Sequence, residues 1–349
     1  MKKRRFVQPM DKKTLLSRIS RILKLSSVLI LAGCATVGPD YNAPDLSPPA
    51  AWRAELSKGL ETGTEDTVSL SAWWDSLGDS VLSGLMEQAV TGNLDLKKAE
   101  ASLREARARR IMSRSGLFPS VDASGSVSRS RGSEETGSGS ERELYRAGFD
   151  AGWEIDLFGG VRRSVEAANA DLQASRESLR DVLVSLTAEV ALNYVDVRAY
   201  QARIAAAEEI LAVQETTRRL TETRYQSGLE DGLAVRQARY ALESTRSTLP
   251  ALRTALEEAK SRLAVLLGLA PGSLEKMLNA ILPIPTVPRV IVLGVPADVL
   301  RRRPDVRKAE RELAAQTARV GIATADLYPK ITLAGSIGLE SLTADRLLS

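Results

Sequence analysis

The feature that most constrains the fold of this 349-residue chain is an internal repeat. Residues 94–127 align without a gap on residues 304–337, with 11 identities in 34 positions. Each copy holds a helix-like segment, then a Leu-aromatic-Pro triplet, then a segment of alternating polarity. The proline ends the helix, because a residue before proline is driven away from helical geometry. The sequence therefore predicts two copies of one helix–strand unit.

Segments of alternating polarity follow both triplets. In residues 121–128, 145–157 and 331–340 the odd positions are mostly apolar or small and the even positions mostly polar or small. Strands of about 9–11 residues can cross a bilayer at a tilt, and one apolar face opposite a polar face is typical of a barrel between lipid and water. A soluble hairpin with one buried face would explain the same alternation. If the hairpin, at about 117–158, belongs to a barrel, five polar residues are expected to face its lumen: Asp122, Arg146, Asp150, Glu154 and Asp156.

The segment after this hairpin predicts very long helices. From Val161 to about Gln226 the chain reads as one helix of roughly 100 Å. A second helix is expected from Leu233 to Leu267, with Pro250 inside it. Their apolar positions are mostly small or medium-sized, which lets neighbouring helices approach closely. We expect a wall of helices packed on two sides, and an ordinary coiled coil is the alternative.

Composition excludes several classes of function. The chain has no histidine and a single cysteine, Cys34. Histidine-based catalysis, histidine-ligated metals and intrachain disulfides are therefore excluded. Residues 1–33 hold nine Lys/Arg and one acid, whereas the remainder holds 39 basic and 43 acidic residues. The basic excess lies wholly in the leader, so the chain lacks the electrostatic surface of a nucleic-acid binder.

The leader predicts export and lipid attachment. A basic segment starting at Met1 or Met10 precedes an apolar one, as in a secretory signal that ends at residue 33. Leu31, Ala32 and Gly33 before Cys34 resemble a bacterial lipobox, so we expect Cys34 to carry diacylglycerol and an acylated amine (palmitate-type chains). Several buried acyl chains, at about 0.8 kcal/mol per CH2, anchor a protein firmly.

The remaining chain divides into four parts. Residues 34–72 are rich in proline and small residues and predict an extended, lipidated tether. Residues 73–269 form the first repeat, beginning with a helix capped at Asp79 or Ser80 and broken before a second helix from Asp95. Residues 270–298 are a proline-rich connector, and residues 299–349 form a second repeat that is incomplete.

Ordered motifs along the chain resemble one protein family. The motifs are Val37-Gly38-Pro39-Asp40-Tyr41, Trp73-Trp74, Trp153 to Gly159, Arg224-Tyr225 with Gly228, and Leu300 to Val306 with Glu310. Together they resemble the outer membrane efflux proteins, the TolC-like family, and specifically its lipoprotein branch of NodT-type factors. The likeness covers nearly everything from Cys34 onward.

This resemblance implies a fold and a function. The fold is mainly α-helical with a small membrane β-barrel portion, long antiparallel tunnel helices, β-hairpin strands and two repeats. Three protomers close a twelve-strand barrel in the outer membrane, and the helices continue as a tunnel across the periplasm. A periplasmic adaptor and an inner-membrane proton-driven transporter of the resistance-nodulation-division type complete the pump. On this resemblance we expect the protein itself to be a passive, gated conduit without catalysis or cofactor.

Two departures from the family pattern affect these expectations. Leu233-Ala234-Val235 lacks the aspartate that the family often has after the helix turn. The family's last strand and last helices have no counterpart before Ser349, so we expect a truncated chain with an exposed strand edge, which would be an inactive fragment of the channel.

Two other classes of function remain open. A periplasmic coiled-coil scaffold lipoprotein explains the helices and Cys34 but not the repeated strands. A cell-wall hydrolase would use acids such as Asp150, Glu154 and Asp156, but catalytic carboxylates need a cleft. Solvated lumen charges are the simpler interpretation.

Overall fold

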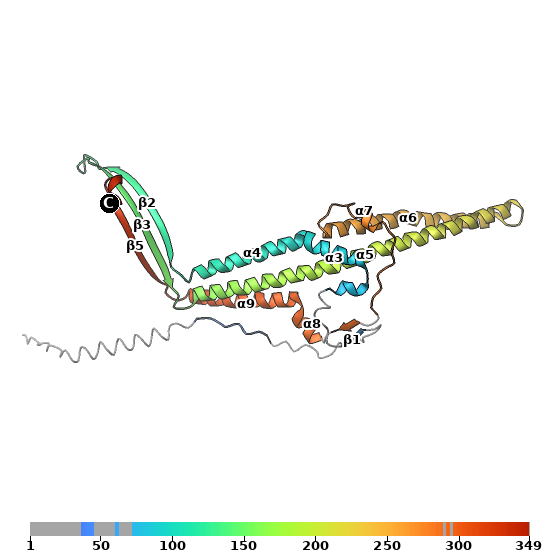
Figure 1. Ribbon diagram of the computed structural model, residues 1–349, viewed down its shortest axis with the longest axis horizontal. Coiled ribbons are helices and arrows are strands. Elements are labelled where there is room, and N and C mark those ends of the chain that lie inside the picture. Colours follow the sequence, from blue (N-terminus) through green and yellow to red (C-terminus); the bar gives the residue numbers. More distant parts are fainter. Residues whose placement is uncertain (1–35, 45–59, 63–71, 289–290, 294–295, 349) are drawn as a thin grey trace, which may run out of the picture. The chain divides into compact units, whose positions relative to one another are not determined.

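The structure is a computed structural model that describes residues 36–44, 60–62, 72–288, 291–293 and 296–348 (Figure 1). The leader, the lipobox residues Leu31, Ala32 and Gly33, Cys34 and most of the predicted tether lie outside the described residues. The chain divides into two compact units. One comprises residues 1–44, 104–174 and 309–349, and the other comprises residues 45–103 and 175–308.

The internal repeat is confirmed by the bounds of its helices. Helix α4 (Leu94–Ser115) and helix α9 (Pro304–Ala325) each have 22 residues. Both bounds of α9 lie 210 residues after those of α4, which is the shift that aligns the two repeats in the sequence. The strands that follow them are β2 (Ser120–Arg131) and β5 (Ile331–Ser341). Both pair antiparallel with β3 (Glu141–Ile155), giving the order β2-β3-β5. Equivalent strands of the two repeats therefore flank one shared strand.

The hairpin strands are longer than the alternation predicts. Both β2 and β3 extend into the polar stretch between residues 129 and 143. Arg129 joins them there, with its guanidinium 2.6 Å from the Glu141 carboxylate and 3.6 Å from that of Glu143. Ladder hydrogen bonds and cross-strand charge pairs continue the pairing after the alternation ends.

Two long helices follow the sheet, as predicted. Helix α5 (Gly160–Gln226) has 67 residues, which corresponds to about 100 Å. Helix α6 (Gly232–Leu266) has 35 residues and contains Pro250. The Asp231 carboxylate begins α6 by accepting hydrogen bonds at 2.9 Å from the backbone N–H groups of Leu233 and Ala234.

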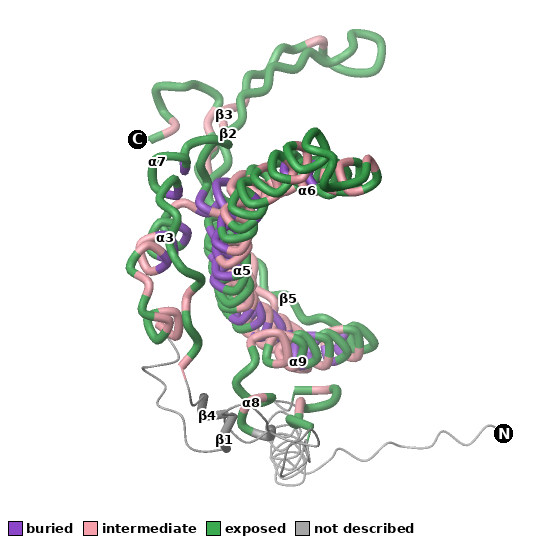
Figure 2. Tube along the Cα trace, turned by 90° about the vertical axis from the view of Figure 1, so that its right-hand side faces the viewer, coloured by how far each residue is buried: buried purple, intermediate pink, exposed green. Residues whose placement is uncertain are grey.

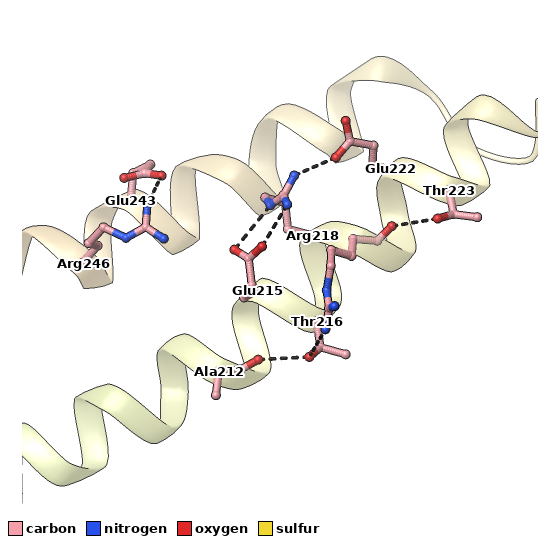
Figure 3. A network of polar contacts seen from close by, with 9 residues as sticks. Ala212, Glu215, Thr216, Arg218, Glu222, Thr223, Glu243 and Arg246 are labelled. Atoms are coloured by element: carbon pink, nitrogen blue, oxygen red, sulfur yellow. Dashed lines mark hydrogen bonds and ion pairs between the residues drawn. The ribbon is translucent and has the colours of Figure 1, made fainter.

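The end of α5 next to this turn is held by charges within the helix. Arg218 lies 2.8 Å from the carboxylate of Glu215 and 2.6 Å from that of Glu222 (Figure 3). The hydrogen bond to Glu215 is the main cause that raises the pKa of Arg218. Such solvent-accessible pairs within one helix contribute little to its stability. Beyond Ala207 the residues of α5 are exposed or intermediate, and none of them is buried.

The main hydrophobic core lies in the unit formed by residues 45–103 and 175–308. Helix α3 (Ser80–Gly92), capped by Asp79, packs there with α5, α6 and the short α7 (Glu275–Leu278), beside the 3-10 helix η1 (Trp73–Leu77). The fully buried large residues of this core include Leu82, Leu85, Met86, Val190, Tyr194, Val197, Leu263, Leu267 and Leu278.

Several short elements were not predicted. Strands β1 (Leu60–Thr62) and β4 (Ile291–Leu293) pair in parallel, joining the predicted tether to the predicted connector. Helix α8 (Pro296–Arg302) precedes α9, and η2 (Ala344–Arg346) follows β5. Elements of three to seven residues are too short to show a period. Within the described part of the chain, no helix combines the length and apolarity needed to cross a membrane.

Candidate functional site

The three-stranded sheet brings together four of the five predicted site residues. Its register pairs even positions with even positions, so Asp122 lies opposite Asp150, and Arg146 lies opposite Glu340. Glu154 lies on the same face, since it is four residues beyond Asp150 on β3. Apart from Arg142 and Leu144, this face is otherwise made of small or hydroxyl residues: Ser120, Ser124, Ser126, Ser128, Ser130, Gly148, Gly152, Thr332, Ala334, Ser336 and Gly338.

Polar contacts on this face cross between the strands. The guanidinium of Arg146 lies 3.0 Å from the Glu340 carboxylate, and the Ser124 hydroxyl donates a hydrogen bond of 3.2 Å to Asp150. Asp122 stands directly opposite Asp150 on the neighbouring strand. Like charges in this position destabilise a sheet unless they are hydrated. Both aspartates are exposed, so this face of the sheet is polar and open to solvent in the single chain.

The opposite face of the same sheet is apolar. Away from the charged end of the hairpin (Arg129, Arg131, Glu141 and Glu143) and from Ser341, its odd-numbered residues are Val121, Ala123, Gly125, Val127, Tyr145, Ala147, Phe149, Ala151, Trp153, Ile155, Ile331, Leu333, Gly335, Ile337 and Leu339. Phe149 is 57% exposed and Ile337 is 75% exposed. No residue of the three strands is buried, and exposed or intermediate colours run along all of them (Figure 2). An uncovered apolar surface of this kind marks a contact with a protein or a membrane.

Asp156, the fifth predicted residue, makes contacts at the start of α5. It lies one residue beyond β3 and its carboxylate caps α5. It accepts hydrogen bonds from the backbone N–H groups of Val161, at 3.0 Å, and Arg162, at 2.9 Å. The Arg162 side chain also lies 3.2 Å from it. The first N–H groups of a helix have no partner within the helix, so a nearby carboxylate binds them.

Aromatic residues mark the end of the sheet where the helices begin. Phe158 stacks on Tyr328 with ring centroids 4.6 Å apart. The Trp153 indole donates a hydrogen bond of 3.2 Å to the Leu117 carbonyl. Aromatic rings with a polar group are typical of the border of a membrane-spanning barrel. Among the described residues, no group of three or more acidic or cysteine side chains is placed to hold a metal ion.

Sequence reasoning missed the partner of Arg146. Glu340 follows the alternation of its strand, but only the register of β5 against β3 places it opposite Arg146. The repeat carried a usable signal, because it predicts that β5 occupies a position equivalent to that of β2.

Comparison with known proteins agrees with this geometry. The family model for outer membrane efflux proteins matches residues 85–269, which include the hairpin, α5 and α6. The chain belongs to the outer membrane efflux protein family. It is 33% identical over 316 residues to nodulation protein T of Rhizobium leguminosarum bv. trifolii, covering 88% of this chain and 65% of that protein.

Two further relatives extend this comparison. The antibiotic efflux pump outer membrane protein ArpC of Pseudomonas putida is 32% identical, with 91% of this chain and 66% of that protein covered. The solved structure of the outer-membrane channel OprN has 36% identity and a TM-score of 0.81, covering 90% of this chain and 70% of that one. The fold expected from the sequence is thereby confirmed. The chain spans slightly less than two thirds of the length of its first curated relatives.

Proposed function

We propose that this chain is the outer-membrane channel component of a tripartite efflux pump. In this function it is a passive, gated conduit that exports small molecules and catalyses no reaction. The observation that carries the proposal is the sheet with one polar face and one uncovered apolar face. Those two faces are what a strand needs when lipid lies on one side and a water-filled lumen on the other.

The dimensions of the elements support this proposal. The apolar face runs over 11 residues of β3, from Tyr145 to Ile155, which matches the length of about 9–11 residues for a tilted transmembrane strand. Helix α5, at about 100 Å, extends well beyond a bilayer of about 30 Å. The strands are thus suited to the membrane, and the helices to a tunnel through the periplasm.

The polar face then supplies the lumen. In this arrangement Asp122, Arg146, Asp150 and Glu154 face water inside the barrel, and Glu340 joins them as the partner of Arg146. Asp156 holds the start of α5 instead. The same contacts weigh against a carboxylate hydrolase, because the acids that motivated that alternative serve in strand-to-strand and helix-capping contacts.

The partners follow from the family. We propose a homotrimer, completed by a periplasmic adaptor and an inner-membrane transporter of the resistance-nodulation-division type. The efflux-pump name of the Pseudomonas relative supports this assembly. We propose further that Cys34, after cleavage behind Leu31, Ala32 and Gly33, carries the lipid that attaches the chain to the outer membrane.

A periplasmic scaffold lipoprotein is the second candidate, and oligomeric state in the outer membrane separates the two. The test compares boiled and unboiled outer membranes on a denaturing gel, from hosts expressing this chain or the chain extended to the length of its relatives. A channel predicts a heat-sensitive trimer for the extended chain. A scaffold predicts a monomer pattern for both, which would contradict the proposal. Cys34→Ala should abolish lipid labelling in either case.

A further inference from the structure

A cavity of about 300 Å³ lies at the end of the sheet where the helices begin. Its walls come from the end of α4, the end of β3, the start of α5 and the end of α9, and these segments all belong to one compact unit. Cavities that hold drug-sized molecules measure about 300–1,000 Å³. This one is therefore large enough for one small organic molecule.

Small residues keep the cavity open. The helices approach one another closely here, because a Cβ on Gly160 would lie 3.2 Å from the Cβ of Ala325, and a Cβ on Gly116 would lie 3.2 Å from the Cγ1 of Val161. A larger side chain on any of the three helices would fill the space between them. The small residues of the lining are Ser113, Gly116, Gly160, Ser164 and Ala325.

A second part of the lining is apolar and comes from the end of β3, the start of α5 and the end of α9. Apolar walls with a few polar groups are typical of sites for small organic ligands. This part of the lining favours a ligand with an apolar body. Its residues are Ile155, Leu157, Phe158, Val161, Ile322 and Pro329.

Four charged residues complete the lining, and they do not balance. Asp156 lies 3.2 Å from the Arg162 side chain, and Asp326 lies 2.9 Å from the Lys330 ammonium. Within the described part of the chain, the Glu154 side chain has no hydrogen bond or ion pair of its own, and it interacts only electrostatically with Lys330. Three carboxylates thus share two cations, which leaves a net charge of −1 at the cavity.

We propose that this cavity binds a small amphipathic molecule that carries one positive charge, with its apolar body against the apolar lining and its cation beside Glu154. An anion is repelled by the uncompensated carboxylate. A metal ion needs several oxygen ligands at once, and no group of acidic side chains among the described residues is placed to supply them. A passive conduit needs no ligand site, so this inference goes beyond the proposed function and does not depend on it.

The test measures the binding of ethidium, an amphipathic aromatic cation, to the full chain purified from outer membranes in detergent. Fluorescence titration against a baseline of detergent micelles should show saturable binding of ethidium and none of fluorescein, an anion of similar size. Glu154→Gln keeps the shape of the side chain without its charge and should weaken ethidium binding at least about tenfold. The matched control is Asp122→Asn, which removes a charge from the same face of the sheet outside the cavity and should bind as the wild type does.

A second pair of variants tests the cavity itself. Ser113→Phe places a ring in the lining, whereas Ser115→Phe places the same ring two residues further along α4, at an exposed residue that is not part of the lining. Ser113→Phe should abolish saturable binding of ethidium and Ser115→Phe should retain it. Circular dichroism of both variants establishes that their helices are intact.

A charge reversal guards against loss of binding through misfolding. Glu154→Lys should lose ethidium and gain saturable binding of fluorescein, which an unfolded variant cannot do. This reversal, together with the losses in Glu154→Gln and Ser113→Phe, supports the inference.

Two results would overturn it. Ethidium binding that never saturates, or that survives in Ser113→Phe, means that the cavity holds no ligand. Binding that is lost in Ser113→Phe but unchanged in Glu154→Gln contradicts the preference for a cation. Neither result affects the proposed channel function, which is tested separately by trimer formation in the outer membrane.

Discussion

Two regions of this chain differ in whether their apolar residues are buried. In the core built from α3, α5, α6 and α7, side chains such as Leu85 and Leu263 are completely buried by the chain itself. In the three-stranded sheet, Phe149 and Ile337 stay mostly exposed. The first region can be stable through its own contacts, and the second has an apolar face that only its surroundings can cover. This difference is what the proposed channel function predicts for a sheet that lies in a membrane.

Polar groups show the same contrast. In the core, the Tyr194 hydroxyl donates to Asp79 at 2.6 Å, and the buried Arg198 donates to Tyr194, Gln201 and the Ala280 carbonyl at 2.6–3.0 Å. All of these contacts are made between protein groups, and only the buried Nη2 atom of Arg198 has no partner among them. On the sheet, Asp122 and Asp150 lie opposite each other and both are exposed. The core pairs its polar groups with other protein groups, whereas the sheet leaves its polar groups exposed to solvent.

The largest expected effect removes a core side chain. Leu263→Ala should lower the free energy of unfolding by about 2–5 kcal/mol, because it leaves a cavity in a closed core. Ile337→Ala removes a side chain of the same size from the exposed face of β5 and should change the stability of detergent-solubilised protein by less than about 0.5 kcal/mol. Urea unfolding followed by circular dichroism measures both, and equal losses would remove the basis of the comparison.

A charge on either face of β5 is the next test. Ile337→Arg places a guanidinium on the apolar face, which should cost about 2–4 kcal/mol in a bilayer. Ser336→Arg places the same group at the adjacent position, on the polar face of the sheet, and should be close to neutral. Folding into lipid vesicles from urea distinguishes the two variants. A similar cost at both positions would mean that neither face contacts lipid.

The buried network of the core should respond less strongly. Arg198→Met leaves the Gln201 amide oxygen and the Ala280 carbonyl without this donor, which should cost about 1–3 kcal/mol. Arg262→Met, at an exposed residue that donates to Asn193 at 2.9 Å, is the control and should cost under about 1 kcal/mol. Thermal unfolding of the two variants beside the wild type provides the measurement.

The smallest effect is a change in alkaline stability. Burial of the Tyr194 phenol, helped by its hydrogen bond to Asp79, raises its pKa to about 12. An unfolded tyrosine loses its proton near pH 10, so the folded state binds this proton more tightly. The stabilisation from this proton is complete below about pH 10 and is lost as pH rises toward about 12.

Tyr194→Phe removes this titration and should therefore lose less stability than the wild type between about pH 10 and 12. The comparison variant is Tyr240→Phe, at a residue that is 77% exposed. Urea unfolding at several alkaline pH values should give Tyr240→Phe the slope of the wild type. A wild-type slope for Tyr194→Phe as well would show that the buried phenol does not contribute.

Long periodic elements of this fold were predictable from the sequence. The 67-residue helix, the helix containing Pro250 and the cap at Asp79 follow from local signals. The repeat predicted the third strand, because a shift of 210 carries the strand after Leu117 onto the strand after Leu327. Four of the five expected site residues share one face, since alternation alone decides which face a strand residue occupies.

The remaining features depend on distant contacts. Asp156 follows the alternation of β3 in the sequence. It caps α5 because β3 ends one residue before it, which the alternation does not indicate. Nothing around Arg163 in the sequence indicates partners 123 to 126 residues away. The parallel pair of three-residue strands β1 and β4 has no period to detect. Local sequence patterns predict the helices, the strands and the face that each strand residue occupies. Contacts between residues far apart in the sequence require the tertiary structure.

The central claim, that lipid covers one face of the sheet and water the other, is tested most directly by thiol accessibility. Single cysteines are introduced at neighbouring positions of opposite face, Ser126→Cys with Val127→Cys and Ser336→Cys with Ile337→Cys, in outer membranes treated with a charged thiol reagent. The account predicts rapid labelling at 126 and 336 and protection at 127 and 337. Equal labelling at both positions of each pair, or the reverse order, would contradict it.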